Sequence, residues 1–593
     1  MHQLTRVRIK NYKSCKDITL HLSDYSTMVG YNNAGKSNIL EAINWFLNPS
    51  GFDKSSFNDP DEEIIVEGLI EGVTEELLEE IEDKHRERIE DYVSDGKILF
   101  KRVQSEPGGR KKLRDLYLRN LEEDEDSENA WDENPTGIDN AIGKLFPKPI
   151  LIPAMDDATE DISKHKRSTT IGKLISEILK PIERDREEEI NEILDGLRER
   201  FEAGGDNRNE ELQAFDQEAN QKIDDFFPGV EIKVHIPTPE IDELFKSGTV
   251  KITEDGYQAL RDFDSLGHGA QRSIQMALIR QLAETSRDTG ETGRTLLLIE
   301  EPELFLHPQG VWRLKKALKN LSSGNYQIIV TTHSPLMLDK IDIPKTILIR
   351  KSKEEGTYRL KSIEEAVEEK IQDHSSQADI LFALRNSSKI LFSEEIILLE
   401  GKTESQVVSE AYKLISDNSD LKSEIAFVPL RGSGDIIKAI EILAEMQLKV
   451  KAIADLDFIF KKAFGNEFLE EDDDDIEACK NLFAEKAEEL EIKLSEDGWP
   501  KKNVENNTSA EEAYEKLAND EDIQPHIENL HQKLRAKNIW VWKTGAIEKP
   551  FGITAKNDRA RAKLLTEMEQ AENPFDQVDN PQLVQGLVDW LNK

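Results

Sequence analysis

The run G30-Y-N-N-A-G-K-S37 constrains the fold of this 593-residue chain more than any other feature. The segment Asp24–Val29 leads into it, and Ser37–Leu47 continues with its apolar residues on one side of a helix. A strand, a glycine-rich loop and a helix in that order are the context that a phosphate-binding loop requires. The run therefore predicts an α/β domain with a nucleotide site where the helix begins.

The residue types in this run suit contact with phosphate. Gly30 and Gly35 let the backbone wrap the phosphates, so that N–H groups and the helix N-terminus face the negative charge. Lys36 is expected to reach the β and γ phosphates, and the Ser37 hydroxyl is expected to bind Mg²⁺. The candidate ATP-binding residues of the run are Gly30, Asn33, Gly35, Lys36, Ser37 and Asn38.

Charge and length bound what the chain can do. A chain of 593 residues exceeds one hydrophobic core, so roughly two to four domains are expected. The net charge of −41 argues against sequence-independent adhesion to DNA but leaves DNA open as a substrate. Acidic runs such as L121-E-E-D-E-D-S-E and E470-E-D-D-D-D475 are interpreted as solvated surface.

Cysteine usage and hydropathy indicate the compartment. Cys15 and Cys479 are too few for a disulfide framework or a cysteine zinc site. The chain lacks a run of about 18 apolar residues, and its start, MHQLTRVRIK, lacks an apolar signal core. A soluble cytoplasmic protein is expected.

Apolar spacing suggests how the chain is divided. Residues 160–225 have helical spacing and predict an inserted hairpin or small bundle, either a self-contained arm or, as we favour, a dimer contact. Strands are expected at Val230–Ile236 and Thr249–Thr253. The runs T295-L-L-L-I-E300 and Q327-I-I-V-T331 are nearly all apolar, as in central parallel strands.

A second α/β unit follows a charged segment at 351–390. Strands and helices are expected to alternate there, at Ile396–Leu399, Glu404–Ile415, Ile425–Pro429, Ile436–Met446 and Val450–Ala454. The predicted fold class is thus α/β, with an ATPase domain, a helical insertion and a C-terminal α/β domain. The expected bounds are 1–159 and 226–370 for the two ATPase parts, 160–225 for the insertion, 371–391 for a linker and 392–593 for the last domain.

Further short runs suit a nucleotide site. Glu300 and Glu301 end an apolar strand, where one carboxylate can hold the magnesium shell and its neighbour can orient the attacking water. His333 ends the next strand and is a candidate sensor of the γ-phosphate. The run S265-L-G-H-G-A-Q-R272 opens a helix with glycines and a hydroxyl, which is another anion-binding geometry.

Together these runs resemble the ABC ATPases typified by structural-maintenance and recombination-mediator proteins, over residues 1–350. Gly30–Ser37 match Walker A, Glu300 and Glu301 match Walker B, Pro302–Pro308 resemble the D-loop, and His333 resembles the switch histidine. Ser265–Gln271 resemble the signature motif, through Ser265, Gly267, Gly269 and Gln271. The resemblance implies that these residues complete the ATP site of a partner subunit, so the chain is at least a dimer. Two points depart from the pattern: Glu300 replaces the usual Asp, and Pro153–Asp157 offers no glutamine for a Q-loop.

Four acids of the second unit lie at strand ends. Glu400 ends one strand, Glu404 opens the next helix, and Asp455 and Asp457 end another strand, on the same side by alternation. In an open parallel sheet the carboxyl ends of the strands gather at one crevice, so these acids are expected to converge. Clustered carboxylates suit Mg²⁺ or Mn²⁺, and two such ions can support phosphodiester cleavage.

This order resembles the Toprim domain of topoisomerases, primases and overcoming-lysogenization-defect (OLD) nucleases, over residues 392–560. By that resemblance Glu400 is the catalytic glutamate, Asp455 and Asp457 are the acidic pair, and Glu404 is the second acid of the OLD subgroup. Gly432 and Gly434 match its glycine turn, and Glu548 is a candidate ligand of the second metal. A downstream lysine supports the transition state in such enzymes, and Lys556 and Lys563 both remain candidates. Trp540 and Trp542 are expected to be core residues.

An ABC-type ATPase followed by Toprim resembles the OLD family of ATP-dependent endonucleases, many of which act in bacterial defence against phages, including retrons and Gabija-like systems. The leading hypothesis is a metal-dependent DNA endonuclease or nickase that is gated by ATP. Its expected partners are DNA, a second copy and products of neighbouring defence genes. The alternative is a repair or scaffold ATPase whose Toprim-like module only binds. A topoisomerase is disfavoured because no segment resembles a separate DNA-breaking domain.

Overall fold

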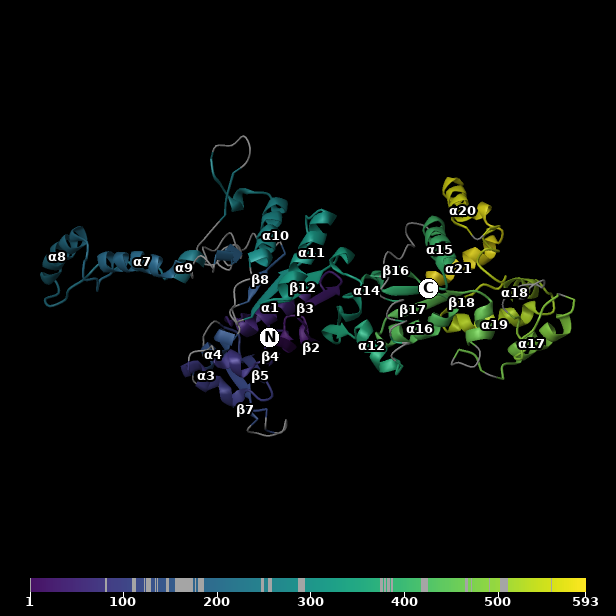
Figure 1. The fold of residues 1–593 in the computed structure, drawn as a ribbon, viewed down its shortest axis with the longest axis horizontal. Coiled ribbons are helices and arrows are strands. Elements are labelled where there is room, and N and C mark those ends of the chain that lie inside the picture. Colours follow the sequence, from purple (N-terminus) through teal and green to yellow (C-terminus); the bar gives the residue numbers. More distant parts are fainter. Residues whose placement is uncertain are drawn as a thin grey trace. The chain divides into compact units, whose positions relative to one another are not determined.

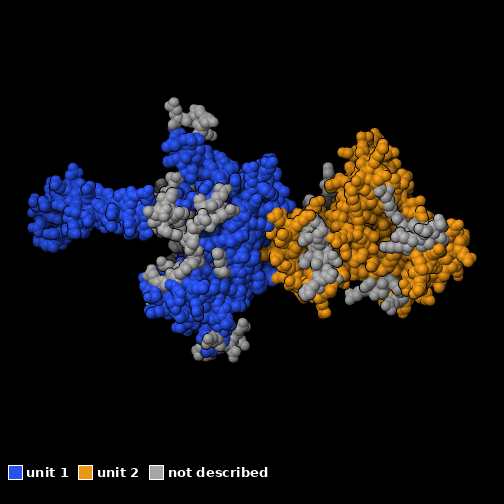
Figure 2. Space-filling model, in the orientation of Figure 1, with its two compact units in different colours: residues 1–28, 32–337, 349–359 blue, residues 29–31, 338–348, 360–593 orange. Residues whose placement is uncertain are grey.

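The computed structural model has a mixed α/β fold in two compact units. Residues 1–28, 32–337 and 349–359 form unit 1, and residues 29–31, 338–348 and 360–593 form unit 2 (Figure 2). The structure describes residues 2–593 except 80–82, 109–113, 122, 124–129, 134, 136, 146–148, 155–173, 176–177, 180–185, 247–249, 254–258, 286–293, 374–376, 378–379, 381–383, 385–387, 417–424, 464–467, 471, 490, 502–509 and 556. Across the described part of the chain, no helix combines the length and the apolarity that crossing a membrane requires.

The larger sheet has twelve strands in the order β7-β6-β5-β4-β1-β2-β14-β13-β3-β12-β11-β8 (Figure 1). Strands β1, β2, β4, β5, β6 and β7 pair antiparallel, whereas β8, β11 and β12 are parallel. The strands are β1 (Gln3–Tyr12), β2 (Cys15–His21), β3 (Tyr25–Gly30), β4 (Ile64–Glu71), β5 (Lys97–Gln104), β6 (Arg114–Arg119), β7 (Trp131–Glu133), β8 (Ile150–Ile152), β11 (Thr295–Glu300), β12 (Tyr326–Thr332), β13 (Ile347–Ser352) and β14 (Gly356–Leu360).

The two apolar runs near residues 300 and 330 form parallel central strands, as predicted. Every residue of β11 and β12 is buried. Helices α10 and α11 pack on these strands through Met276 and Leu314, which share a core with Leu297 and Ile328. Burial on both faces explains why the strands are nearly all apolar.

The helices of this part cover the sheet or connect its strands. They are α1 (Lys36–Leu47), α2 (Glu75–Glu79), α3 (Asp83–Ile89), α4 (Ile138–Leu145), α7 (Glu187–Phe201), α8 (Glu210–Asp224), α9 (Ile241–Lys246), α10 (His268–Thr285) and α11 (Pro308–Ser322). Short 3₁₀ turns lie at Lys54–Ser56, Glu90–Tyr92, Phe263–Ser265, Pro335–Met337 and Ile343–Lys345, and β9 (Lys251–Ile252) pairs with β10 (Arg261–Asp262).

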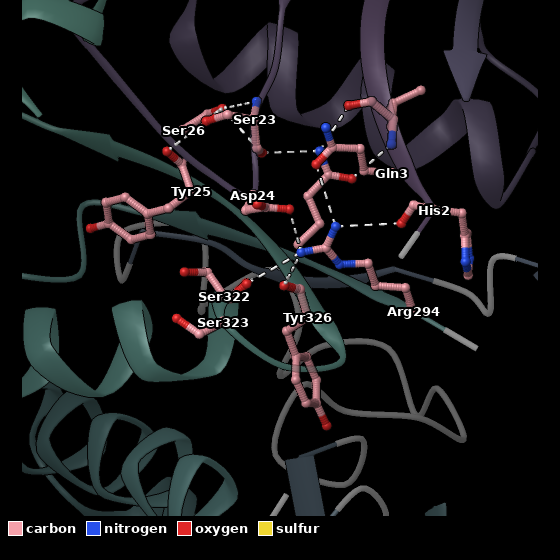
Figure 3. A network of polar contacts seen from close by, with 12 residues as sticks. His2, Gln3, Ser23, Asp24, Tyr25, Ser26, Arg294, Ser322, Ser323 and Tyr326 are labelled. Carbon is pink, nitrogen blue, oxygen red and sulfur yellow. Dashed lines mark hydrogen bonds and ion pairs between the residues drawn. The ribbon is translucent and has the colours of Figure 1, made fainter. Parts of the chain in front are cut away.

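A buried arginine ties the N-terminal strand to the central strands (Figure 3). One guanidinium nitrogen of Arg294 donates to the carbonyl of His2, at 3.4 Å. The other nitrogen donates to the carbonyls of Ser322 and Tyr326 and pairs with Asp24 at 2.6 Å. These contacts satisfy a buried charge and fix where β1 lies beside the elements that carry the nucleotide residues.

The described part of the predicted insertion contains helices α7 and α8, separated by a turn at 202–209, and further helical residues at 174–175 and 178–179 (Figure 1). The strand expected at Val230–Ile236 was wrong, because this segment is irregular. Its backbone pairs with side chains of α8 instead: Asn220 exchanges two hydrogen bonds with Ile232, and Asp216 accepts from the Val234 N–H. Side-chain partners therefore replace a strand ladder there.

Unit 2 is built on a four-stranded parallel sheet of order β16-β15-β17-β18. Its strands are β15 (Glu395–Leu399), β16 (Ile425–Pro429), β17 (Lys449–Ala454) and β18 (Ile539–Val541). Its helices are α12 (Ile363–Lys370), α14 (Lys389–Phe392), α15 (Lys402–Ile415), α16 (Ile436–Glu445), a π-helical turn (Ile459–Ala463), α17 (Asp474–Lys486), α18 (Ala510–Ala518), α19 (Gln524–Ala536), α20 (Asp558–Gln570) and α21 (Pro581–Leu591), with 3₁₀ turns at Ser433–Asp435 and Pro574–Gln577.

The core of this unit lies between the sheet and helices α15, α20 and α21, and Figure 1 shows α16 on the other side of the sheet. Trp540 and Trp542 are buried in that core, as predicted. The interpretation of residues 470–475 as solvated surface holds for Glu470, Asp472 and Asp474, which are exposed, but is wrong for Asp475. Asp473 caps the start of α17, and Asp475 is buried with hydrogen bonds from His526, Asn529 and Lys533.

Candidate active sites

The phosphate loop runs from the end of β3 to the start of α1. Asn33 and Gly35 adopt left-handed backbone conformations, with φ of 64° and 101°. A Cβ at Gly35 would lie 2.1 Å from the hydroxyl oxygen of Thr357, so only glycine fits there. That hydroxyl donates to the carbonyl of Ala34 at 2.9 Å, which fixes the loop from behind.

The remaining residues of the run are placed by α1. Gly30 is the last residue of β3, and Ser37 lies exposed in the first turn of α1. Asn38 donates to the hydroxyl of Ser14 at 2.7 Å, and Ser14 bonds in turn to Thr357. The helix N-terminus thus presents backbone N–H groups and the Ser37 hydroxyl at one point, a geometry suited to phosphate and magnesium.

Lys36, His333 and Glu301 form one connected group. The ammonium nitrogen of Lys36 lies 2.8 Å from Nε2 of His333, and the same ring nitrogen lies 3.2 Å from a carboxylate oxygen of Glu301. Burial lowers the pKa of Lys36 to about 8, against the opposing effect of the nearby Glu301 charge. The hydrogen bond to His333 lowers the pKa of Glu301. The structure therefore brings together three residues that the sequence assigned to the nucleotide site.

Glu300, the last residue of β11, and Glu301, which follows it, have different partners. Glu300 is buried and accepts a hydrogen bond from the Ala154 N–H at 3.1 Å, whereas Glu301 reaches His333. Glu303, two residues further on, accepts from the Thr332 hydroxyl and from the N–H of His333. Sequence reasoning assigned no role to Glu303, although its spacing from Glu301 within E301-P-E303 offered a signal.

The segment that contains the predicted D-loop, together with the preceding Glu301, carries backbone strain. Glu301 and Phe305 adopt positive φ values of 41° and 62°, conformations that side chains of this size rarely adopt. Such strain commonly marks functional segments, because surrounding contacts must maintain it. Phe305 is nevertheless 62% exposed.

The residues that resemble a signature motif lie in the turn before α10 and in its first turn. Ser265 and Gly267 are exposed, and the Ser265 hydroxyl donates to the carbonyl of Asp262. Gln271 is buried and donates to the carbonyls of Phe263 and Leu266, which closes this turn. Gly269 is the second residue of α10, and an added Cβ there would contact only Phe305, at 3.7 Å.

Arg272, which follows the signature residues, is fully buried and was missed as a site residue. It donates to the carbonyls of Glu300, Glu301 and Pro153, so it joins α10 to the end of β11. Burial lowers the pKa of its guanidinium to about 10. The candidate Q-loop begins at Pro153, but its residues 155–157 lie outside the described residues.

In unit 2 the sequence-predicted acids collect at the carboxyl edge of the parallel sheet. Glu400 follows β15 and accepts a hydrogen bond from the backbone N–H of Asp455 at 3.1 Å. Asp455 follows β17, and its carboxylate accepts from the backbone N–H of Ile547 at 3.3 Å. Glu404 is buried in the first turn of α15. Two strand ends and the first turn of a helix therefore contribute to one acidic group at the edge where the topology predicted it.

The expectation that strand alternation places Asp455 and Asp457 on one side was wrong. β17 ends at Ala454, and Asp457 begins the helical turn that continues through Ile459–Ala463. One of its carboxylate oxygens accepts from Lys461 at 2.6 Å. The turn, rather than the pleat of a strand, thus sets the direction of Asp457.

The acids interact strongly with one another. Burial raises the pKa of Asp455 well above its usual range, and the charges of Glu404, Glu400, Glu548 and Asp457 raise it further. Burial also raises the pKa of Glu404 to about 7, with added effects from Glu400 and Glu548. The pKa of Glu400 is raised by burial, although backbone N–H groups of Asp455 and Ser433 oppose this. Such mutual repulsion is what a bound cation relieves.

These residues fit a divalent cation by their chemistry. All five are carboxylates, the ligands that Mg²⁺ and Mn²⁺ prefer, and the second oxygen of Asp457 is buried with no hydrogen-bond partner. Among the residues that the structure describes, no three such side chains already stand close enough together to hold a metal ion. Backbone N–H groups and Lys461 engage part of the oxygens instead, so ligation requires side-chain movement.

The other predicted residues of this site have different outcomes. Glu548 is buried and its charge acts on both Asp455 and Glu404. Gly432, at φ 151°, begins the turn in which Ser433 donates to Glu400. Lys563 is 74% exposed and pairs with Glu567 along α20. Lys556 lies outside the described residues.

Two basic residues near the acids were missed. Lys461 pairs with Asp457, and Arg561 is buried on α20 with a hydrogen bond to the Thr403 hydroxyl, next to Glu404. For Lys461 a signal existed, because a lysine four residues after an aspartate pairs with it on a helix. For Arg561 the sequence offered no local signal, because its partner Thr403 lies 158 positions earlier.

Comparisons with known proteins identify a domain family in each of the two parts of the chain. Residues 3–338 match the AAA ATPase domain family, and residues 391–457 match the TOPRIM domain of overcoming lysogenization defect protein-like proteins. The Old nuclease of Escherichia phage P2 is 38% identical over 565 residues, which cover 93% of this chain and 94% of the phage protein.

More distant relatives are also nucleases by name. The OLD nuclease of Thermus scotoductus is 22% identical, over 77% of this chain and 82% of its own. The endonuclease GajA of Bacillus cereus strain VD045 is 22% identical, over 68% of this chain and 66% of its own. Among solved structures, an Smc head domain from Pyrococcus furiosus aligns with 62% of this chain and 98% of its own, at 15% identity and a TM-score of 0.35. The chain belongs to the OLD nuclease family, as an enzyme that joins an AAA-type ATPase domain to an OLD-like TOPRIM domain.

Proposed function

We propose that this chain is a metal-dependent DNA endonuclease or nickase whose cleavage is gated by ATP binding or hydrolysis. The observation that carries the proposal is the group of buried acids at the carboxyl edge of the unit 2 sheet. Burial and mutual repulsion raise the pKa values of Glu400, Glu404 and Asp455. A site that concentrates negative charge in this way is costly for a fold unless cations use it.

The proposed chemistry is hydrolysis of a phosphodiester bond. Glu400, Glu404, Asp455, Asp457 and Glu548 would hold Mg²⁺ or Mn²⁺, which supplies an activated water and stabilises the leaving oxygen. Glu400 and Asp455 are oriented by backbone N–H groups, so they can keep their direction when the other acids adjust. Lys556 and Lys563 remain the proposed candidates for supporting the transition state.

The ATP site is proposed to act as the gate. Gly30, Asn33, Gly35, Lys36, Ser37 and Asn38 would bind the phosphates and Mg²⁺, with Glu300 and Glu301 as the Walker B acids and His333 as the sensor. The contact of Lys36 with His333, which in turn contacts Glu301, supports this, since a γ-phosphate would compete for the same ammonium group. Glu301 would orient the attacking water.

A dimer is the proposed assembly. Ser265, Gly267, Gly269 and Gln271 would complete the ATP site of a second copy, and Ser265 and Gly267 are exposed as that role requires. Large apolar side chains are also exposed around α7, α8 and the following segment: Ile193, Leu197, Phe215, Phe226, Phe227, Val230, Ile232, Ile236 and Leu244. Apolar groups gathered in this way are typical of an interface.

The proposed biological role is defence against phages in the bacterial cytoplasm, with products of neighbouring defence genes as further partners. Family membership supports this role. The proposed domain bounds remain 1–159 and 226–370 for the ATPase, 160–225 for the dimer arm, 371–391 for the linker and 392–593 for the nuclease domain. Ile380 and Leu384 are buried, so the linker is anchored at these positions.

A plasmid assay tests the proposed function. Supercoiled plasmid is incubated with the full chain and Mg²⁺ or Mn²⁺, with and without ATP, beside Asp455→Ala and Lys36→Ala. We expect nicked or linear DNA from the wild type, loss of at least about 100-fold with Asp455→Ala, and an altered response to ATP with Lys36→Ala. Asp589→Asn, an exposed change on α21, serves as the control. Intact plasmid under every metal and nucleotide condition, with ATP turnover retained, would favour a scaffold ATPase instead.

A further inference from the structure

Lys461 forms an ion pair with one carboxylate oxygen of Asp457, a proposed metal ligand. Its ammonium nitrogen lies 2.6 Å from one carboxylate oxygen of Asp457, four residues earlier. The lysine belongs to the π-helical turn Ile459–Ala463, which follows directly on the D-x-D segment. π-Helical turns are rare and frequently occur at functional sites.

The ammonium group of Lys461 also packs against an aromatic ring, that of Tyr514. The ammonium nitrogen lies 5.1 Å from the centre of the Tyr514 ring, within the range of a cation–π contact. The Tyr514 ring stacks on Phe460 at 5.6 Å and 8°, and Phe483 meets both rings edge-on. All three rings are buried. The lysine head therefore rests on a fixed surface while it contacts Asp457.

The other oxygen of Asp457 is buried and has no hydrogen-bond partner. The negative charge of Asp457 also raises the pKa values of Glu400 and Asp455, so these three carboxylates repel one another. A carboxylate in this position is unfavourable unless a cation accompanies it. Lys461 supplies that cation within the chain itself.

We propose that Lys461 is a built-in counter-ion, which holds Asp457 in the acidic group and is exchanged for a divalent cation when the nuclease site is loaded. It is thus a positioning residue that lowers the affinity of the site for metal. The inference rests on the proposed function, because it takes the acids to be metal ligands. It adds that metal uptake requires breaking an ion pair.

The exchange predicts a specific change in metal affinity. An ion pair of this partly exposed kind is worth a factor of about five in an equilibrium constant. Removing the ammonium group in Lys461→Met is therefore expected to lower the Mn²⁺ dissociation constant about fivefold. Lys461→Arg keeps the charge and is expected to stay within about twofold of the wild type.

Calorimetric titration of the full chain with Mn²⁺, without DNA or nucleotide, measures these constants. Lys462→Met is the matched control, since it removes the same charge from the same turn. Tighter binding in Lys461→Met alone supports the exchange. An unchanged constant in Lys461→Met, or an equal gain in Lys462→Met, overturns it. If the wild type binds no Mn²⁺ at all, the proposed metal site itself is wrong. This outcome differs from the one in which the wild type binds Mn²⁺ and only the exchange of Lys461 is wrong.

A measurement on the wild-type sequence covers the case in which Lys461→Met does not fold. Lysines are ¹³C-methylated, and the Lys461 signal is assigned as the one lost in Lys461→Arg. Addition of Mg²⁺ is expected to shift this signal as the ammonium group leaves Asp457. A signal that stays in place while Mg²⁺ binds overturns the exchange.

Discussion

Lys36 and His333 lie 297 positions apart in the chain, yet their side-chain nitrogens are 2.8 Å apart. His333 in turn contacts Glu301, so one imidazole connects the lysine proposed to bind phosphate to the glutamate proposed to orient the attacking water. A histidine in this position can influence turnover without being needed to bind the nucleotide.

His333→Ala is therefore expected to slow ATP turnover about 100-fold, the usual range for losing a group that moves or positions a proton. The affinity for ATP is expected to stay within about threefold, because Lys36 keeps its place in the loop. Phosphate release and binding of a fluorescent ATP analogue measure the two effects separately. His21→Ala, on an exposed position of β2, is the control. Equal losses in binding and turnover would contradict this role.

Asp455→Asn is expected to stabilise the metal-free protein while it abolishes cleavage. Burial and the surrounding like charges raise the pKa of the wild-type carboxylate, so its ionisation destabilises the fold increasingly as pH rises above the pKa of the unfolded chain. The amide keeps an acceptor for the Ile547 N–H. Thermal unfolding in EDTA at pH 8 should show a gain of about 2 °C, and a smaller gain at pH 5, where the wild-type group is protonated more often. A loss of stability would show that the carboxylate is needed for structure.

The stability of unit 2 is expected to depend on pH through His531. Burial lowers the pKa of this imidazole to about 4 from 6.5. The unfolded chain therefore binds its proton more readily, and stability falls as pH drops below 6.5, until the loss is complete below pH 4. At pH 5 the loss amounts to about 2 kcal/mol.

Urea unfolding at pH 7 and pH 5 tests this effect. His531→Gln should lose less stability than the wild type on acidification, by about that amount, because its side chain does not titrate. His21→Gln, an exposed change, should behave like the wild type. Identical pH dependence in the wild type and His531→Gln would show that His531 is not responsible.

The exposed phenylalanines after α8 are expected to lie in the dimer interface. Phe226 and Phe227 are 79% and 67% exposed. Phe226→Asp combined with Phe227→Asp should convert dimers to monomers at micromolar concentration, because charges replace apolar contacts. Light scattering after size-exclusion chromatography reports the mass. The double change Gln221→Asp with Lys222→Asp, at exposed positions of α8, adds acids without removing apolar surface. Equal masses for wild type and the phenylalanine variant would place the interface elsewhere.

The sequence predicted the elements whose signal is local. The strand, loop and helix around Gly30–Ser37 and the alternation of strands and helices after Ile396 rest on apolar spacing over short segments. The meeting of Glu400 with Asp455 was also predictable, since the carboxyl ends of parallel strands share one edge of a sheet.

What the sequence did not predict depends on distant partners. The segment Val230–Ile236 has strand-like alternation, but side chains of α8 take its backbone hydrogen bonds. Asp457 belongs to a helical turn because β17 ends at Ala454. Apolar spacing does not predict the end of a strand to within one residue. Arg561 meets Thr403 only once α15 and α20 have packed.

Arg272 has a mechanical consequence. Its guanidinium donates hydrogen bonds to the carbonyls of Glu300 and Glu301 and is fully buried, so water cannot replace these bonds. Breaking these hydrogen bonds would leave the Arg272 charge buried without partners, which is unfavourable. The start of α10 and the end of β11 are therefore expected to move together as a rigid body. A displacement of the start of α10, where Ser265 and Gly267 are exposed, would therefore also displace the backbone of Glu300 and Glu301.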